Sequence, residues 1–197
     1  MINLKKGSSI SLEKDGKALE RIYVGMNWGK IKKFWGMMES SVDLDGSVAT
    51  FDVNKKTIDT VYFKKRISND QSIFHSGDDL TGDSADDGKD NEVITINLKK
   101  VSPKVNTIVV FLNSFKGQQF DTIPYANIRL LEGDTKTIKR EFATFNLASE
   151  PSFAGKVSMV MAKISRSGDN WKFTTIGEAV GSTGIIDTVK LIQEEYI

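Results

Sequence analysis

The sequence predicts an all-β fold, a two-sheet antiparallel β-sandwich that ends in a short C-terminal helix. Short runs rich in β-branched and aromatic residues recur along the chain, separated by turn-forming Gly, Asp, Asn and Ser. Several runs alternate between apolar and polar residues, which is the pattern of a strand with one buried face. The chain has 197 residues, 3 prolines and no cysteine. At this length a single domain, residues 1–197, can bury a full core without disulfides.

The individual strands follow from local patterns. Residues 92–98 alternate cleanly, and 107–112 are continuously apolar, as expected of a central strand buried on both faces. Residues 157–164 and 170–176 form a hairpin around a turn at 165–169. The expected strands are two between Asn3 and Leu12, broken at Gly7, and then 21–28, 42–52, 57–63, 92–98, 107–112, 125–130, 157–164 and 170–176.

The C-terminal segment changes to a helical period. Ile185, Val189, Ile192 and Tyr196 are spaced by four, three and four residues, which places them on one face of a short amphipathic helix. This helix starts after the break at 181–184. We expect it to pack against a sheet edge.

The stretch from Asp78 to Glu92 dominates the chemistry of the chain. It holds seven carboxylates and one cation, Lys89, in a protein of formal net charge +1. Crowded carboxylates repel one another, and Ca²⁺ offsets this repulsion by taking about six to eight oxygen ligands. Because the surrounding donors are almost all oxygen, Ca²⁺ is favoured over zinc or copper, with Mg²⁺ as a weaker alternative. A solvated acidic loop without an ion is the other interpretation.

A second acidic pair, Asp43 and Asp45, opens the predicted strand 42–52. Residues two apart on a strand face the same side, so both carboxylates can point at one ion. If this strand end lies beside the 78–92 loop, the two stretches supply enough oxygens for about two calcium ions. The spacing excludes an EF-hand, because taking Gly88 as the required glycine places Ile94 where a glutamate is needed. His75, the single histidine, has no Ser or Cys partner, and we assign it neither a catalytic nor a metal-binding role.

The two acidic stretches resemble the signature of the TerD family of tellurium-resistance and bacterial stress proteins. The resemblance rests on Ser76–Asp83, on Asp90–Ile94 and on Val42–Ser47, and it extends to 4–7, 24–28 and 171–173. It implies a calcium-binding β-sandwich that works with other tellurium-resistance or stress proteins, some of them in the membrane. Two departures stand out: Gly29 replaces an aspartate that the family commonly has after the tryptophan, and the loop between Asp83 and Asp90 is longer than usual. The candidate metal ligands are Asp43, Asp45, Asp78, Asp79, Asp83, Asp87, Asp90, Asn91 and Glu92.

Two other functions remain open at this stage. Clustered carboxylates could hold Mg²⁺ for phosphoester hydrolysis, although the chain lacks a Gly-rich phosphate loop ending in Lys-Ser or Lys-Thr. The basic aromatic segment Lys30–Trp35 could bind a polyanion, although the acidic loop makes nucleic acid an unfavoured partner. That segment could equally bind a protein, or fold its aromatic side chains onto the body.

The localisation that we expect is cytoplasmic. The first residues lack the apolar run and small-residue cleavage site of a signal peptide, and the longest apolar run, 108–112, is too short to span a bilayer. From the acidic stretches and the family resemblance we expect a non-enzymatic calcium-binding interaction module, in which the bound ion orders the acidic loop.

Overall fold

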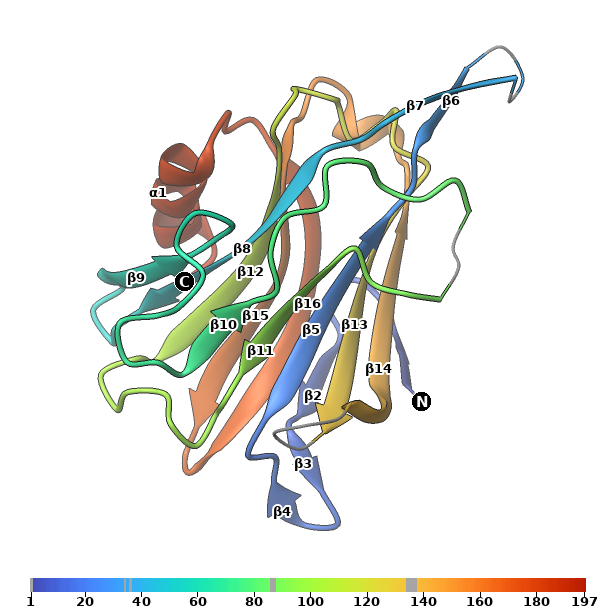
Figure 1. The fold of residues 1–197 in the computed structure, drawn as a ribbon. Coiled ribbons are helices and arrows are strands. Elements are labelled where there is room, and N and C mark those ends of the chain that lie inside the picture. Colours follow the sequence, from blue (N-terminus) through green and yellow to red (C-terminus); the bar gives the residue numbers. More distant parts are fainter. Residues whose placement is uncertain (1, 34, 36, 86–87, 134–137) are drawn as a thin grey trace.

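The structure, a computed structural model, describes residues 2–33, 35, 37–85, 88–133 and 138–197. Two sheets of six strands each face one another, as Figure 1 shows, and the chain crosses between them repeatedly. The predicted two-sheet sandwich with a short C-terminal helix is confirmed.

The first sheet has the strand order β1-β14-β13-β5-β11-β10. Its neighbours are antiparallel apart from β1, which runs parallel to β14 and makes this sheet mixed. Its strands are β1 (Ile2–Leu4), β5 (Ile22–Trp28), β10 (Ile73–His75), β11 (Glu92–Ile96), β13 (Tyr125–Gly133) and β14 (Ile138–Ala148).

The second sheet has the order β2-β16-β15-β12-β8-β9, and its neighbours are antiparallel. The predicted hairpin near 165–169 is confirmed, with longer strands and a shorter turn than expected. The strands are β2 (Ser9–Ser11), β8 (Leu44–Phe51), β9 (Thr57–Val61), β12 (Thr107–Ser114), β15 (Ser158–Ser167) and β16 (Asn170–Val180). Smaller elements are β3 (Glu13–Lys14), β4 (Lys17–Ala18), β6 (Ile31–Lys33), β7 (Met38–Ser40), the 3₁₀ turn η2 (Pro151–Phe153) and α1 (Ile185–Glu195).

The main core lies between the sheets, and a second apolar layer lies outside the second sheet. On β8, Leu44 and Val48 point into the main core, whereas Ala49 and Phe51 point outward, because successive side chains of a strand alternate. All eight residues of β12 are buried, which confirms the prediction that its two faces are covered.

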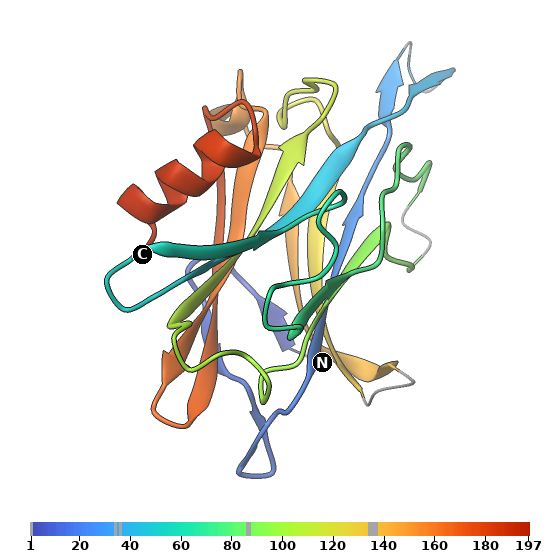
Figure 2. The same ribbon diagram turned by 60° about the vertical axis from the view of Figure 1, so that its left-hand side comes forward.

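Helix α1 provides that outer cover. Its residues Val189 and Ile192 are buried in the same apolar cluster as Phe51, Val109 and Phe111. Figure 2 shows the helix beside the second sheet. The predicted helix is confirmed, but its expected position at a sheet edge is wrong. It covers the outer face, because the outward side chains of β8, β12 and β15 are apolar there.

Residues 31–33 and 38–40 form a separate two-stranded sheet. Strands β6 and β7 pair with each other and project beyond the body of the sandwich (Figure 1). Trp35 lies between them and is fully exposed, so the alternative in which the aromatic side chains fold onto the body is wrong for Trp35. Phe34 lies outside the described residues. Among the described helices, none has the length and apolarity needed to cross a membrane.

Candidate metal site

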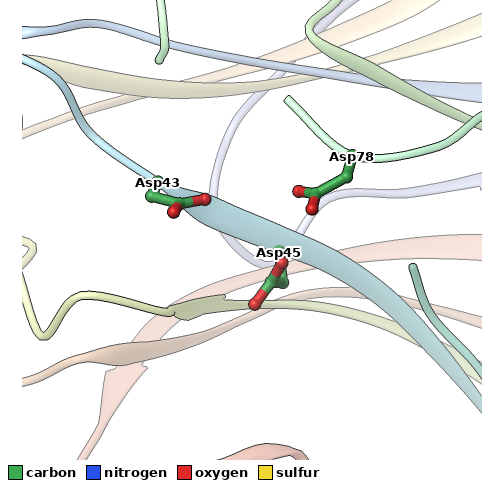
Figure 3. Close-up of side chains that lie close together, drawn as sticks. All are labelled: Asp43, Asp45 and Asp78. Atoms are coloured by element: carbon green, nitrogen blue, oxygen red, sulfur yellow. The ribbon is translucent and has the colours of Figure 1, made fainter. Parts of the chain in front are cut away.

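Three carboxylates from two parts of the chain converge beside the second sheet. Asp43 immediately precedes β8, Asp45 is the second residue of β8, and Asp78 lies in the loop between β10 and β11. One oxygen of each lies within 4.8 Å of the others, and Figure 3 shows the three side chains gathered around a common space. Within the described part of the chain, this is the group of acidic side chains whose spacing suits a metal ion.

Strand geometry explains this convergence. Asp43 and Asp45 are two residues apart and therefore share the outward side of β8. On one flank of β8, Asp45 lies opposite Asn113 of β12. On the other flank, β9 pairs with β8 only from Val48 onward. The first half of β8 thus has a free flank, and the segments around the acidic loop lie along it.

A buried pair, Glu92 and His75, satisfies the backbone on that free flank. The Gly46 N–H donates to Glu92 Oε2 at 2.8 Å, and His75 Nε2 donates to the Gly46 carbonyl at 2.9 Å. His75 Nδ1 accepts a hydrogen bond from the Gly77 N–H at 3.0 Å, so the ring is the neutral tautomer with its proton on Nε2. Both side chains are fully buried, with Nε2 also 3.3 Å from Glu92 Oε2. The two side chains therefore take the place of a neighbouring strand.

The electrostatics of the cluster disfavour its negative charge. Burial, and then the carboxylates of Glu92, Asp78 and Asp43, together raise the pKa of Asp45 from 3.8 to about 7. Burial, followed by the charge of Asp43, also raises the pKa of Asp78. A bound cation would remove this cost, because it stabilises the ionised form of each carboxylate.

The two carboxylate oxygens of Asp43 have different surroundings. Its Oδ2 lies 3.1 Å from Lys116 Nζ. Its Oδ1 is buried and has no hydrogen-bond partner among the described residues. A buried acceptor without a donor is costly, so the cluster suits a ligand that attracts oxygen. The chemistry of this donor set, carboxylate oxygens alone, fits Ca²⁺ or Mg²⁺.

Asp79 folds the loop onto itself. Its Oδ1 accepts hydrogen bonds from the Thr81 N–H at 2.8 Å, the Gly82 N–H at 3.0 Å and the Thr81 hydroxyl at 3.1 Å. Its own N–H donates to Glu92 Oε1 at 3.3 Å. Burial raises the pKa of Asp79, but these hydrogen bonds outweigh burial and hold the pKa below its usual value. Asp79 therefore fixes the loop's shape through this oxygen.

Asp83 and Asn91 tie the rest of the loop to the end of β5. Asn27 Nδ2 donates to Asp83 Oδ2 at 2.6 Å and to Asn91 Oδ1 at 3.2 Å. Asn91 Oδ1 also accepts the Trp28 N–H at 2.8 Å. Since the Asp83 N–H donates to the Trp28 carbonyl at 3.0 Å, the backbone is joined as well. Both residues are candidate metal ligands from the sequence, but no sequence pattern predicts their hydrogen bonds to Asn27 and Trp28.

Three further positions complete the account of the predicted residues. Asp90 Oδ1 accepts a hydrogen bond from Arg129 Nε at 2.8 Å, so Asp90 forms an ion pair with a residue of β13 in the first sheet. Asp87 lies outside the described residues. Gly29, where the family commonly has aspartate, has no space for a side chain, because an added Cβ would lie 2.6 Å from the Tyr125 ring and 2.7 Å from Pro124.

Sequence reasoning missed three residues of this region. Asn113 lies in β12 and Lys116 lies in the turn after it. Both are far from the acidic motifs in the sequence, so only the register of β8 with β12 reveals them. The sequence assigns His75 no role, but in the structure this residue supports the strand that carries Asp45. Its position directly before the acidic loop was the available signal.

The fold and the site define a class: a small β-sandwich protein with an all-oxygen cluster, suited to a hard cation, between a strand and an acidic loop. The chain belongs to the TerD domain family, which it matches over residues 1–189. Tellurium resistance protein TerZ of Serratia marcescens is 34% identical, over 95% of this chain and 94% of that protein. Stress response protein SCP2 of Bacillus subtilis (strain 168) is 32% identical, over 95% of this chain and 97% of that protein.

The fold likeness extends to solved structures. A crystal structure of a homologue of telluride resistance protein (TerD) from Streptomyces coelicolor A3(2) superposes with a TM-score of 0.64 at 21% identity, covering 89% of this chain and 95% of the other. The family is one of tellurium resistance and general stress response, and the names of these relatives state no catalytic activity.

Proposed function

We propose that this protein is a non-enzymatic calcium-binding module of a cytoplasmic stress-response or tellurium-resistance system. The observation that carries the proposal is the convergence of Asp43, Asp45 and Asp78, with a buried carboxylate oxygen that has no donor among the described residues. Calcium accepts irregular sets of six to eight oxygens, whereas Mg²⁺ demands near-ideal octahedral geometry. Three carboxylates from a strand and a loop suit the more permissive ion.

The role of the ion is to join the loop to the strand. Asp43 and Asp45 are buried at the start of β8, whereas Asp78 is exposed on the loop. Hydrogen bonds already hold the loop through Asp79 and Asn91. Calcium would add the missing link at Asp78 and neutralise the charge there, which would present a fixed surface to a partner.

The partners that we propose are other tellurium-resistance or stress proteins, some of them membrane-associated. The support is the family membership, together with relatives that carry those names. A second calcium ion, which the sequence predicts, would draw its ligands from the remaining candidates of the 78–92 loop.

Thermal unfolding of the metal-stripped protein tests this function. At a calcium concentration of 100 times Kd, binding to the native state adds about 2.7 kcal/mol, which raises Tm by about 5–10 °C for a domain of this size. Asp78→Asn should remove most of this increase, and the exposed Asp169→Asn should leave it intact. An unchanged Tm in saturating calcium would contradict the proposal.

A further inference from the structure

A cleft of about 820 Å³ opens directly onto the candidate metal site. Asp45 and Asn113 line this cleft together with the first turn of α1 and the segment after β9, which includes Tyr62 and Phe63. This volume is within the range of small-molecule sites, which is about 300–1,000 Å³. The cleft is therefore large enough for an organic ligand that reaches the cation.

The amide of Asn113, one of the lining residues, has a buried acceptor without a hydrogen-bond partner in the described part of the chain. Its Nδ2 donates to Ser158 Oγ at 2.6 Å and to Thr188 Oγ1 at 2.9 Å. The Ser158 hydroxyl donates its own proton to the Ser182 carbonyl at 2.7 Å and is therefore an acceptor for the amide, which favours Nδ2 rather than Oδ1 on that side. Asn113 is 5% exposed, and its Oδ1 has no hydrogen-bond partner among the described residues.

The geometry of Asn113 Oδ1 suits the cation. Asn113 and Asp45 are direct cross-strand partners, so their Cβ atoms lie about 4.5–5.5 Å apart on the same face. The amide oxygen can thus supply a neutral ligand to an ion held by Asp45. Even with Asn113, the site leaves room in a coordination shell of six to eight oxygens, and two of its members, Asp45 and Asn113, line the cleft.

The start of helix α1, which lines the same cleft, suits an anion. Helix α1 has no side-chain cap at Gly184, and the first amides of a helix lack intrahelical acceptors. Gly184 and Asp187 both line the cleft, with open space at Gly184. Together with the helix dipole, these amides favour an oxyanion.

The charges of the lining residues make this preference depend on the ion. Lys64 and Lys190 balance Asp45 and Asp187, so the lining side chains sum to zero formal charge. A bound divalent cation adds two positive charges beside this lining, which offset the Asp43 and Asp78 carboxylates that would hold it together with Asp45. The Phe63 and Phe115 rings, which meet edge to face with their centroids 6.1 Å apart, add an apolar surface to the cleft.

The geometry points to this cleft as a binding site for a small organic oxyanion, a phosphate or a carboxylate on an apolar body, that coordinates the bound calcium directly. This inference rests on the proposed calcium site. It assigns Asn113 as an additional calcium ligand, and Lys64, Lys190 and the start of α1 as the anion-binding groups. By reciprocity, the anion and calcium strengthen each other's binding.

The test is an NMR titration of the full chain with phenyl phosphate, following the backbone amides of Ile186 and Asp187, with and without saturating calcium. Phenylacetate, in place of phenyl phosphate, distinguishes a carboxylate from a phosphate, and benzyl alcohol is the neutral control. We expect saturable shifts for an oxyanion, with binding at least about fivefold tighter in calcium. Lys190→Gln and Lys64→Gln should each weaken binding severalfold, and the exposed Lys172→Gln on β16, outside the cleft, should not.

Calorimetric titration of calcium alone separates the two proposals. If calcium binds and neither oxyanion shifts the α1 amides, the cleft proposal fails and the calcium site stands. Equal oxyanion binding with and without calcium would overturn the direct coordination, and equally tight binding of benzyl alcohol would overturn the anion preference. If calcium itself does not bind, both proposals fail.

Discussion

Replacing Asp45 with asparagine should stabilise the calcium-free protein, and increasingly so as the pH rises. Burial, and then the neighbouring carboxylates, raise the pKa of Asp45 to about 7 from 3.8. Between these two values the folded protein binds a proton that the unfolded chain has released. The contribution of Asp45 to stability is thus fully present below about pH 4 and is lost as the pH rises to about 7. The asparagine variant has no such proton to lose.

The size of the effect follows from the pKa difference. One pKa unit corresponds to about 1.4 kcal/mol, so the full loss approaches about 4 kcal/mol, of which about 2–3 kcal/mol falls between pH 5 and pH 8. Comparing the two proteins across pH cancels any constant difference in packing between them. The assay is urea unfolding with a calcium chelator present, followed by tryptophan fluorescence at both pH values.

The control for Asp45→Asn is Asp169→Asn, in the exposed turn between β15 and β16. A stability advantage of Asp45→Asn that does not grow between pH 5 and pH 8 would refute the electrostatic reasoning. In saturating calcium the order should reverse, because wild type gains binding energy that the variant loses.

Three further substitutions test other parts of the structure. Lys116→Gln should tighten calcium binding about fivefold by calorimetry, because it removes a repulsion of about 1 kcal/mol beside Asp43; weaker binding would show that Lys116 supports the site. His75→Leu should lower the unfolding free energy by about 2–4 kcal/mol in urea, because it leaves the Gly46 carbonyl and the Gly77 N–H unpaired; a loss below 1 kcal/mol would contradict this role. Trp35→Ala should change stability by less than about 0.5 kcal/mol, because the side chain is fully exposed; a larger loss would show that Trp35 packs in solution.

The fold could be predicted because its signals are local. The alternation in 92–98 defines one buried face, and the continuous apolar run 107–112 requires cover on both faces. Which element covers the second face of this strand depends on tertiary packing. The helical period of 185–196 predicts an apolar stripe, but its target depends on which face of β8 and β12 turns outward.

The candidate site could be predicted only in part, because a carboxylate's role depends on what it meets. Period-two spacing brings Asp43 and Asp45 to one side, and the structure adds Asp78. Counting acidic residues does not separate these from Glu92, which accepts hydrogen bonds from backbone N–H groups, or from Asp90, which pairs with an arginine. That distinction rests on strand register, in particular on β9 ending before it covers the first half of β8.

The central claim is that Asp43, Asp45 and Asp78 hold calcium. Calorimetric titration of the metal-stripped protein with Ca²⁺, with Mg²⁺ as the competing ion, tests this claim most directly. We predict saturable Ca²⁺ binding that is tighter than Mg²⁺ binding and is lost in both Asp43→Asn and Asp78→Asn, which lie on different segments. Calcium binding that survives both substitutions, or no calcium binding by the wild-type protein, would contradict it.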